Sequence, residues 1–535
     1  MTSRTFPFIF VAKRKMEKSN NLKEVGLLVE ACRCWERMAA FRQMRSRNMR
    51  YCYGDQWGDY VMVDGKKVRE EDYIRSQGSE PLKNNLIRRL VKQVLGLYRA
   101  EDMPLQCMVM QAQHQQFAKV MTDVIAYNQW LNRATELNSR MLEEFLISGM
   151  AVQRKTYGLR NGTCDCWTDI VSPAAFFLDS MATDCRGWDV EMLGEIHDMH
   201  FDTLAAAFAT SQQQWQELAD IYSPITYDER LGEFFSEYGL PRTGKQEFFH
   251  TAESRLCRVI EIWYRCRTPQ YLCHDRETAT LYRVDATGKT PYDDTLFTIA
   301  DEWRYAYLTP FGDVLAEGTS PYLHGSHPYV FKAYPFVDAE IHSFVADIID
   351  QQRYTNRLIT LYDWVMRSSA KGVLLVPEES IPEGYSIEDI ADEWARFNGV
   401  IAVKTRNGAL LPQQVSANAV NVGINELLQT QLSFMEDISG VTGALQGKAT
   451  AASVSGTLFQ QQTHNAMLSQ LDLLDTFRDF ILDGVCKDMS NILQYYDSPR
   501  TFASRRSNMS VTYNPEIMRH IQFTIDYKKE GGQPE

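Results

Sequence analysis

The sequence contains no run of about 18 apolar residues, the least that a membrane-crossing helix needs. It also lacks low-complexity tracts and internal repeats, which excludes fibrous and solenoid architectures. Near the N-terminus a short apolar stretch of about six residues lies between basic residues, without a small-residue cleavage site, so no signal peptide is predicted. The first helical pattern begins after Asn21, which makes Met16 an alternative start to Met1.

Positive charge is in deficit. The 535 residues include 56 Lys and Arg against 69 Asp and Glu, a formal net charge of −13. A surface that grips nucleic acid by neutralising phosphates needs the opposite sign. An acidic wall is compatible only with DNA that slides past it without sticking. The apolar fraction of 44% is that of an ordinary soluble protein, and the length leaves room for several domains.

The eleven cysteines form no recognisable framework. Their number is odd and their spacing irregular, and the two Cys-x-Cys pairs (Cys32/Cys34 and Cys164/Cys166) lack the longer spacer of most zinc knuckles. We therefore expect reduced thiols in a protein made in the cytosol, and no structural metal.

Catalytic and nucleotide-binding motifs are also missing. There is no P-loop, G-x-S-x-G, H-E-x-x-H or G-x-G-x-x-G. Residues 443–450 (GALQGKAT) imitate a P-loop, but the spacing is one residue short and Ala449 replaces the Mg²⁺-binding hydroxyl. His197 and His200 lie beside Asp198 and Asp202, yet a strand would place the two histidines on opposite faces, and we expect them to be solvated. We predict no catalytic residue, no metal and no cofactor.

One stretch organises the chain. Asp338 to Ser369 has no Gly or Pro, and its apolar residues recur every three or four positions, which predicts a helix about 50 Å long. Two interpretations remain open. The pattern alone favours a core helix of a large domain. The polar residues from Asp350 to Arg353 interrupt the apolar stripe, and this suits a strut that packs against copies of itself.

The remaining patterns predict an α+β fold. Residues 257–336 show strand periodicity, Asn161-Gly162 is a hairpin signal, and Asn84 or Asn85 is a plausible helix N-cap. Further helices are expected over 22–50, 111–149, 202–219, 421–438 and 457–496. Further strands are expected over 151–158, 164–173, 175–179 and 188–199, in the pair 372–377 and 399–404, and in the C-terminal tail.

Several strings, taken in order over roughly residues 50 to 500, resemble the portal proteins of short-tailed phages. They are G-D-Q-W (54–57), N-N-L-I-R-R-L-V-K-Q-V-L-G (84–96), D-x-V-S-P-x-x-F-F-L-D (169–179), D-x-x-D-x-Q-R-x-x-N (347–356), and S-G-V-T-G-A-L-Q-G (439–447) with S-G at 455–456. Family members often continue into a helical crown or barrel, which is short or missing here.

The resemblance implies a non-enzymatic subunit of a homo-oligomeric ring, usually of twelve copies, at one capsid vertex of the virion. Double-stranded DNA would pass through it, without sequence specificity, during packaging and ejection. The implied partners are the major capsid and scaffolding proteins, the large terminase subunit and tail adaptor proteins, with assembly in the host cytoplasm and no membrane.

Laid onto the sequence, the resemblance implies six regions. They are an N-terminal helical region (1–89), an α+β wing (90–255), a β-rich clip that docks terminase and tail adaptors (256–336), a stem helix (337–372), a strand pair with long helices in the tunnel-loop and wing or crown region (373–500), and a tail (501–535).

Charged residues of the stem are the candidate contacts between subunits or with the channel. They are Asp347, Asp350, Arg353, Arg357, Asp363, Arg367 and Lys371. Salt bridges between neighbouring subunits are the expected role, and transient phosphate contacts by the basic members are the alternative. Two other functions remain open for the whole chain: another virion structural or connector protein, or a hydrolase of unrecognised fold.

Overall fold

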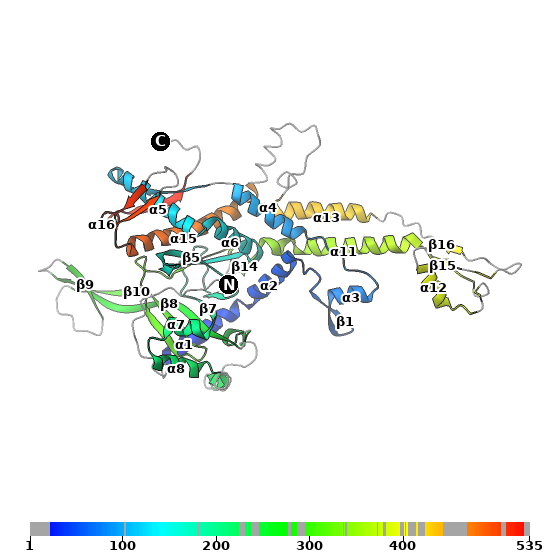
Figure 1. The fold of residues 1–535 in the computed structure, drawn as a ribbon, viewed down its shortest axis with the longest axis horizontal. Coiled ribbons are helices and arrows are strands. Elements are labelled where there is room, and N and C mark those ends of the chain that lie inside the picture. Colours follow the sequence, from blue (N-terminus) through cyan, green and yellow to red (C-terminus); the bar gives the residue numbers. More distant parts are fainter. Residues whose placement is uncertain are drawn as a thin grey trace, which may run out of the picture. The chain divides into compact units, whose positions relative to one another are not determined.

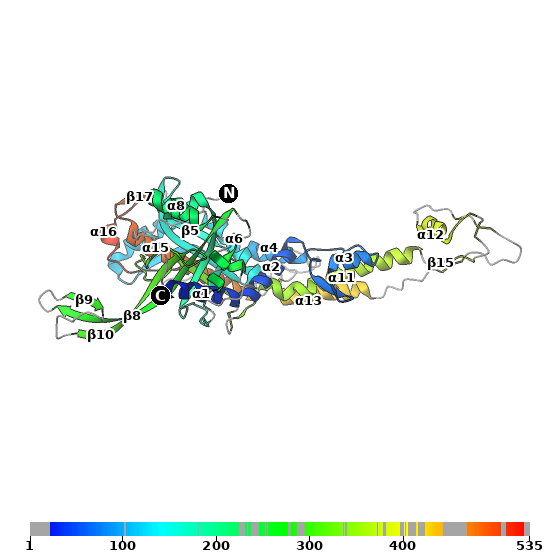
Figure 2. The same ribbon diagram turned by 90° about the horizontal axis from the view of Figure 1, so that it is seen from below.

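The computed structural model describes the chain from residue 22 to residue 528, with gaps. The residues left out within this range are 101–102, 180, 224–229, 233, 237–245, 252, 254, 276–279, 286–294, 335, 338–339, 372, 378–380, 383, 396–400, 402, 405–412, 416–422, 442–467 and 504–509. The chain divides into two compact units (Figures 1 and 2). The first unit contains residues 1–49, 91–347 and 444–535, and the second contains 50–90 and 348–443. The six regions expected from the sequence stay a prediction.

Two antiparallel sheets form the centre of the first unit. One has the strand order β11-β10-β8-β7-β6, with β9 also paired to β8, and the other has the order β12-β4-β5. The strands of the first sheet are β6 (Phe176–Leu178), β7 (Met192–His200), β8 (Leu256–Asp275), β9 (Thr280–Asp285), β10 (Thr295–Leu308) and β11 (Val314–Thr319). Those of the second are β4 (Met150–Arg160), β5 (Thr163–Val171) and β12 (Tyr329–Ala333).

The strand periodicity over 257–336 is confirmed, but the strands are longer and more widely connected than expected. β8 alone has 20 residues and is hydrogen-bonded along its length to β10 and, over Leu256–Tyr264, to β7. This region therefore shares a sheet with the segment before it. The hairpin signal is also confirmed: Asn161 and Gly162 join β4 to β5 with φ of 51° and 79°, as a type I′ turn requires.

Both faces of the larger sheet are buried where β7 pairs with the first half of β8. On one face Leu193, Val259 and Trp263 belong to the same core cluster as Val152 and Tyr329 of the smaller sheet. On the other face, alternate residues of β7 and β8, such as Ile196 and Ile262, pack with α1 (Leu22–Arg37). Alternate side chains of a strand point to opposite faces, so β7 and β8 carry buried apolar residues at both odd and even positions.

Three expected helices are each divided in two. Residues 22–50 form α1 and α2 (Ala39–Tyr53), and 111–149 form α5 (Gln115–Leu131) and α6 (Ala134–Ser148), where Arg133 takes a left-handed conformation between the helices. Residues 202–219 form α7 (Phe201–Phe208) and α8 (Gln212–Ile221), because Ser211 caps α8 through the Gln214 amide. Apolar spacing continues through these breaks, so periodicity alone did not reveal them.

The C-terminal part of the first unit contains α15 (Leu471–Tyr495). This confirms the later part of the helix expected over 457–496, and residues 457–467 lie outside the described part of the chain. The expected tail strands are present as β18 (Ser510–Tyr513), paired with β17 (Arg500–Ala503), and β19 (Phe523–Tyr527), paired with β3 (Leu105–Val109). The remaining short elements are η1 (Ala112–His114), α10 (Gln246–Phe249), α16 (Pro515–Met518), β13 (Phe336–Val337) and β14 (Glu340–Ile341).

The long helix exists as α11 (Phe344–Lys371) and starts later than expected. The residues before it form the β13–β14 hairpin, and the Ser343 hydroxyl accepts a hydrogen bond from the Ala346 amide. A serine that accepts from the third helical residue is a standard N-cap, which explains the start. Among the described residues, no helix is long and apolar enough to cross a membrane.

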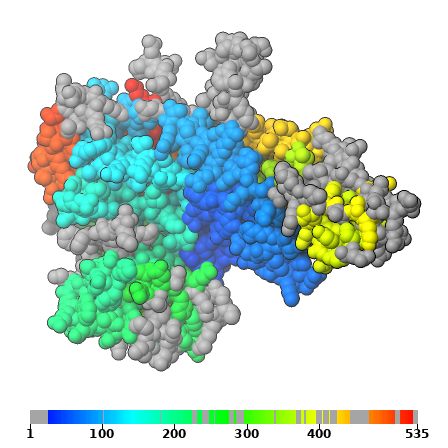
Figure 3. Space-filling model, turned by 45° about the vertical axis from the view of Figure 1, so that its right-hand side comes forward, coloured from blue at the N-terminus to red at the C-terminus, as the bar shows by residue number. Residues whose placement is uncertain are grey.

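The second unit consists of α11 beyond Asp347 and shorter elements. These are β1 (Tyr60–Val63), β2 (Lys66–Arg69), α3 (Glu70–Ser76), the start of α4 (Leu86–Ala100), β15 (Val373–Leu375), α12 (Ile387–Ala395), β16 (Gln413–Val415) and α13 (Ile424–Ser439). The helix expected over 421–438 is thereby confirmed. Much of α12 is exposed, and its yellow atoms form part of the surface in Figure 3.

The expected pairing of 372–377 with 399–404 is wrong. β15 does form, but its partner is β16, with Val373 opposite Val415. The described residues of 401–404 are not in a strand. The apolar string at 399–404 looked like a better strand than Gln413–Val415, which contains two glutamines.

Gly194 of β7 provides a test of the sheet packing. A Cβ at this position would collide with the Glu261 carbonyl oxygen of β8 and approach Phe177 Cζ to 2.5 Å. We expect Gly194→Ala to lower the free energy of unfolding by about 1–3 kcal/mol, as overpacking does. The control is Gly158→Ala in β4, where no atom lies within 4 Å of the added Cβ. Equal thermal stability of the two variants would contradict the described packing.

Candidate functional site

The structure describes five of the seven charged side chains predicted as stem contacts. On α11, Asp347, Asp350 and Arg357 are exposed, whereas Arg353 and Asp363 are half-buried. The side chains of Arg367 and Lys371 lie outside the described residues, although both belong to the helix. The predicted role of these seven residues between subunits stays a prediction.

Arg353 and Arg357 share a partner within their own chain. The Glu70 side chain at the start of α3 is 5% exposed and lies beside both guanidinium groups. Arg353 Nη2 is 3.2 Å from Glu70 Oε2, and Arg357 Nε donates to Glu70 Oε1 at 3.1 Å. A single carboxylate thus holds two arginines one helical turn apart, and this connects α3 to α11 within the second unit.

Three polar side chains, those of Gln56, Gln352 and Asn356, form a connected network with the backbone of Asn84, and we call this group the polar clasp. Gln352 is fully buried, and its Oε1 accepts from the Leu86 and Ile87 amides at 3.0 and 3.3 Å. Its Nε2 donates to the Asn84 carbonyl at 2.7 Å and to Asn356 Oδ1 at 2.9 Å. Gln56 and Asn356 are 1% exposed, and Asn356 donates to Gln56 Oε1 at 2.7 Å.

The polar clasp explains why polar residues interrupt the apolar stripe of α11. The first amides of a helix have no partner within it, and buried amides need one. Gln352 supplies a partner to the first two amides of α4, and Asn85 Oδ1 accepts from the Arg88 amide at 3.1 Å as the N-cap. This confirms one of the two N-cap candidates. Gln352 in the middle of α11 is therefore polar and buried because it completes another helix.

Gln352→Leu tests the polar clasp. The leucine fills a similar volume but leaves the Leu86 amide without its side-chain acceptor and the Ile87 amide without any described one, at a cost of about 1–3 kcal/mol for a buried donor. We expect hydrogen–deuterium exchange of the peptide amides over residues 84–90 to accelerate by about tenfold to a hundredfold. Asp350→Asn, at an exposed site on the same helix, is the matched control. Unchanged exchange in Gln352→Leu would contradict the role of the clasp.

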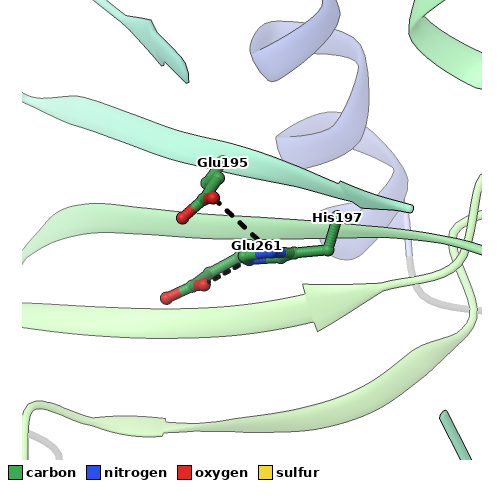
Figure 4. A group of neighbouring side chains, drawn as sticks. All are labelled: Glu195, His197 and Glu261. Atoms are coloured by element: carbon green, nitrogen blue, oxygen red, sulfur yellow. Dashed lines mark hydrogen bonds and ion pairs between the residues drawn. The ribbon is translucent and has the colours of Figure 1, made fainter. Parts of the chain in front are cut away.

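A second polar cluster lies in the core of the first unit (Figure 4). Glu195 and His197 of β7 share a face, and Glu261 of β8 lies directly opposite Glu195. His197 Nε2 is 2.7 Å from Glu261 Oε2, and Nδ1 is 3.7 Å from Glu195 Oε1. Arg154 of β4 comes from the other sheet, with Nη1 3.2 Å from Glu195 Oε2 and 3.6 Å from Glu261 Oε2. All four side chains are at most 4% exposed.

Neutral donors complete this buried cluster. Trp263 Nε1 donates to Glu261 Oε1 at 2.7 Å, and the Tyr329 hydroxyl donates to Glu195 Oε2 at 3.1 Å. Burial would raise the pKa of Glu261, but the hydrogen bond from His197 and the charge of Arg154 lower it to about 2. The carboxylate is therefore charged in the core at neutral pH, and it binds one sheet to the other.

Glu195, His197 and Glu261 are also the metal-ligand candidates among the described residues. One ligand atom from each lies within 4.8 Å of the others. Carboxylate oxygens and imidazole nitrogens bind Zn²⁺. However, the Arg154 guanidinium already supplies positive charge to both carboxylates, and a divalent ion would have to displace the hydrogen bond between His197 and Glu261. The donor set fits an ion-pair network better than a metal.

The sequence analysis found only one member of this cluster. His197 and His200 do lie on one strand, with His197 buried and His200 exposed, so the expectation that both are solvated is wrong for His197. Asp198 pairs with Arg258 at 2.8 Å and not with a histidine. The sequence does contain a signal for the other members. Glu195 and Glu261 are carboxylates within largely apolar strand patterns, two positions before His197 and Trp263 respectively. That signal does not reveal which strands pair.

The low pKa of Glu261 predicts a pH dependence. A carboxyl group with an ordinary pKa of 4.5 in the unfolded chain and about 2 in the folded one contributes stability above pH 4.5 and loses it as pH falls towards 2. The contribution is on the order of 3 kcal/mol. We expect the Tm to fall less between pH 5 and pH 3 in Glu261→Gln than in the wild type.

Other groups titrate in both proteins, including His324, whose pKa is lowered to about 3 by burial. The difference in Tm between the variant and the wild type therefore isolates the contribution of Glu261. Glu340→Gln, at an exposed carboxylate, is the control and should behave as the wild type. Parallel Tm curves for Glu261→Gln and the wild type would show that the carboxylate is not held in its charged form.

Comparison with known proteins supplies the family. A search of curated proteins returns no match. A family model described as "Phage P22-like portal protein" matches residues 30–528. This match extends from α1 through both units to the residue after β19, and it agrees with the resemblance noted in the sequence strings. The chain therefore belongs to the phage P22-like portal protein family.

Proposed function

We propose that this portal protein forms a closed ring of identical subunits, usually twelve in such rings, and that double-stranded DNA passes through the ring during packaging and ejection. Membership of the family supports the portal role and a place at a capsid vertex. The proposal adds the ring, the channel and assembly in the host cytoplasm. It assigns a structural role without turnover and without a cofactor.

The observation that carries the proposal is an exposed apolar surface on two helices of the second unit. In the later part of α11, Leu361 is 46% exposed, and Trp364 and Met366 are each 50% exposed. On α13, Phe434 and Ile438 are each 48% exposed. Clustered exposed apolar residues mark interaction sites. A neighbouring copy of the chain would cover them, as the strut interpretation of this helix requires.

The charged residues of α11 extend this proposal. Asp347 and Asp350 are exposed, and we propose that they contact a neighbouring subunit together with Asp363, Arg367 and Lys371. Arg353 and Arg357 hold Glu70 in their own chain and would reach a neighbour only through their remaining nitrogens. The net charge of −13 per subunit supports a conduit that does not retain DNA.

We also propose that the ring docks the large terminase subunit, tail adaptors, and capsid and scaffolding proteins. The sequence-based choice for terminase and adaptor docking was the region 256–336. Its strands β9 and β10 expose Leu281, Leu296, Phe297 and Ile299 by 55–65%. Exposed apolar side chains on β9 and β10 support a docking role for this region.

Replacing the apolar surface of α11 tests the ring. We expect the wild-type protein to form rings in negative-stain images and a single high-mass species in mass photometry. We expect the double variant Leu361→Glu/Trp364→Glu to remain a monomer, because carboxylates on this surface would be buried without partners. Its circular dichroism should match that of the wild type.

Met181→Glu is the control for that variant. Met181 is 75% exposed in the first unit, and this substitution makes the same change from an apolar to a charged side chain. Rings should persist. A wild-type protein that stays monomeric at every concentration, or rings formed by the double variant, would refute the proposal.

A further inference from the structure

A cavity of about 1000 Å³ lies in the first unit among α4, α5, α6, α15 and the β3–β19 pair. It is lined by Tyr98, Arg99, Met103, Leu105, Ile125, Trp130, Arg133, Arg478, Ile481 and Tyr527, with smaller and polar residues between them. Nothing in the portal role proposed above uses this cavity. Its volume is that of a site for a large ligand.

The floor and the rim of the cavity differ in chemistry. Leu105, Ile125 and Ile481 are at most 9% exposed and present apolar side chains. Arg99 and Arg133 are exposed, and Trp130 is 50% exposed. An apolar floor below a cationic and aromatic rim fits a ligand that combines an apolar group with negative charge.

The rim arginines are unusual in an acidic chain. Among the described residues neither Arg99 nor Arg133 forms an ion pair, although the chain has more carboxylates than basic groups. Arg99 is oriented by its Nε, which donates to Ser139 Oγ at 2.8 Å, while that hydroxyl donates to the Thr135 carbonyl at 2.8 Å. Ser139 is 5% exposed. A buried serine therefore fixes the guanidinium with its terminal nitrogens available.

The start of α6 adds to the positive potential of the cavity. Arg133 is the N-cap residue, makes no side-chain cap, and is followed by the lining residues Ala134 and Thr135. Uncapped amides at the start of a 15-residue helix attract negative charge. Arg478 also lines the cavity, but its Nη1 is 2.5 Å from Asp475 Oδ1, so it is already neutralised.

We propose that this cavity binds a short acidic peptide segment of a partner protein, with an apolar side chain on the floor and carboxylates on Arg99 and Arg133. Guanidinium groups bind carboxylates through paired hydrogen bonds, and the two rim arginines give two such points. The Glu136 carboxylate also lines the cavity and limits how much negative charge the cavity can hold, which favours one or two carboxylates over a polyphosphate or a nucleic acid strand. The proposal goes beyond the ring and does not depend on it.

The first step of the test is to select peptides that bind the protein. The purified full-length protein is immobilised and panned against a randomised heptapeptide library. We expect enrichment of peptides that combine Asp or Glu with one large apolar residue. The most enriched peptide is then synthesised with a fluorescent label, and its Kd is measured by anisotropy. The double variant Arg99→Gln/Arg133→Gln should weaken binding at least about tenfold for each arginine removed.

Two controls make the result decisive. Arg140→Gln changes an exposed arginine of α6 that pairs with Glu143 at 3.2 Å and does not line the cavity, so its Kd should equal that of the wild type. All variants should share one Tm. Selection without acidic enrichment, or equal affinity in the double variant, would overturn the proposal. Competition by inorganic phosphate or hexathymidylate at the peptide's own concentration would overturn it in favour of a phosphate site.

Discussion

The middle of α11 buries polar side chains, and its later part exposes apolar ones, which is the reverse of what a helix in a self-sufficient domain does. Buried amides of α4 require an acceptor, and Gln352 provides it, so the polar middle is satisfied within the chain. In the part of the chain that the structure describes, Leu361 and Trp364 stay about half exposed. Because apolar side chains are stabilised by burial, this exposure supports the proposal that a neighbouring copy covers them.

The first unit follows a different principle. Its two sheets enclose Arg154, Glu195, His197 and Glu261 in a core that is otherwise aromatic and aliphatic. Removing one member of such a network leaves another charge buried without its partner, which costs more than the network itself contributes. The ion pairs thus penalise any other packing of the two sheets.

The sequence predicted the elements better than their partners. Apolar spacing located α11, α13 and most of the strands, and Asn161-Gly162 located a hairpin, because these signals are local. The divisions at Arg133 and Ser211 were missed because apolar spacing continues across them. The pairing of β15 was wrong because a strand partner is chosen by tertiary contacts. The buried cluster around Glu261 was missed for the same reason: its members come from strands that lie far apart in the sequence.

The most direct test of this account is a cryo-electron microscopy map of the assembled wild-type particle. The account predicts a closed ring in which Leu361 and Trp364 of every subunit are buried against the neighbouring copy, while Gln352 still accepts hydrogen bonds from the start of α4 in its own chain. A particle in which these apolar side chains face solvent, or in which α11 meets no copy of itself, would contradict it.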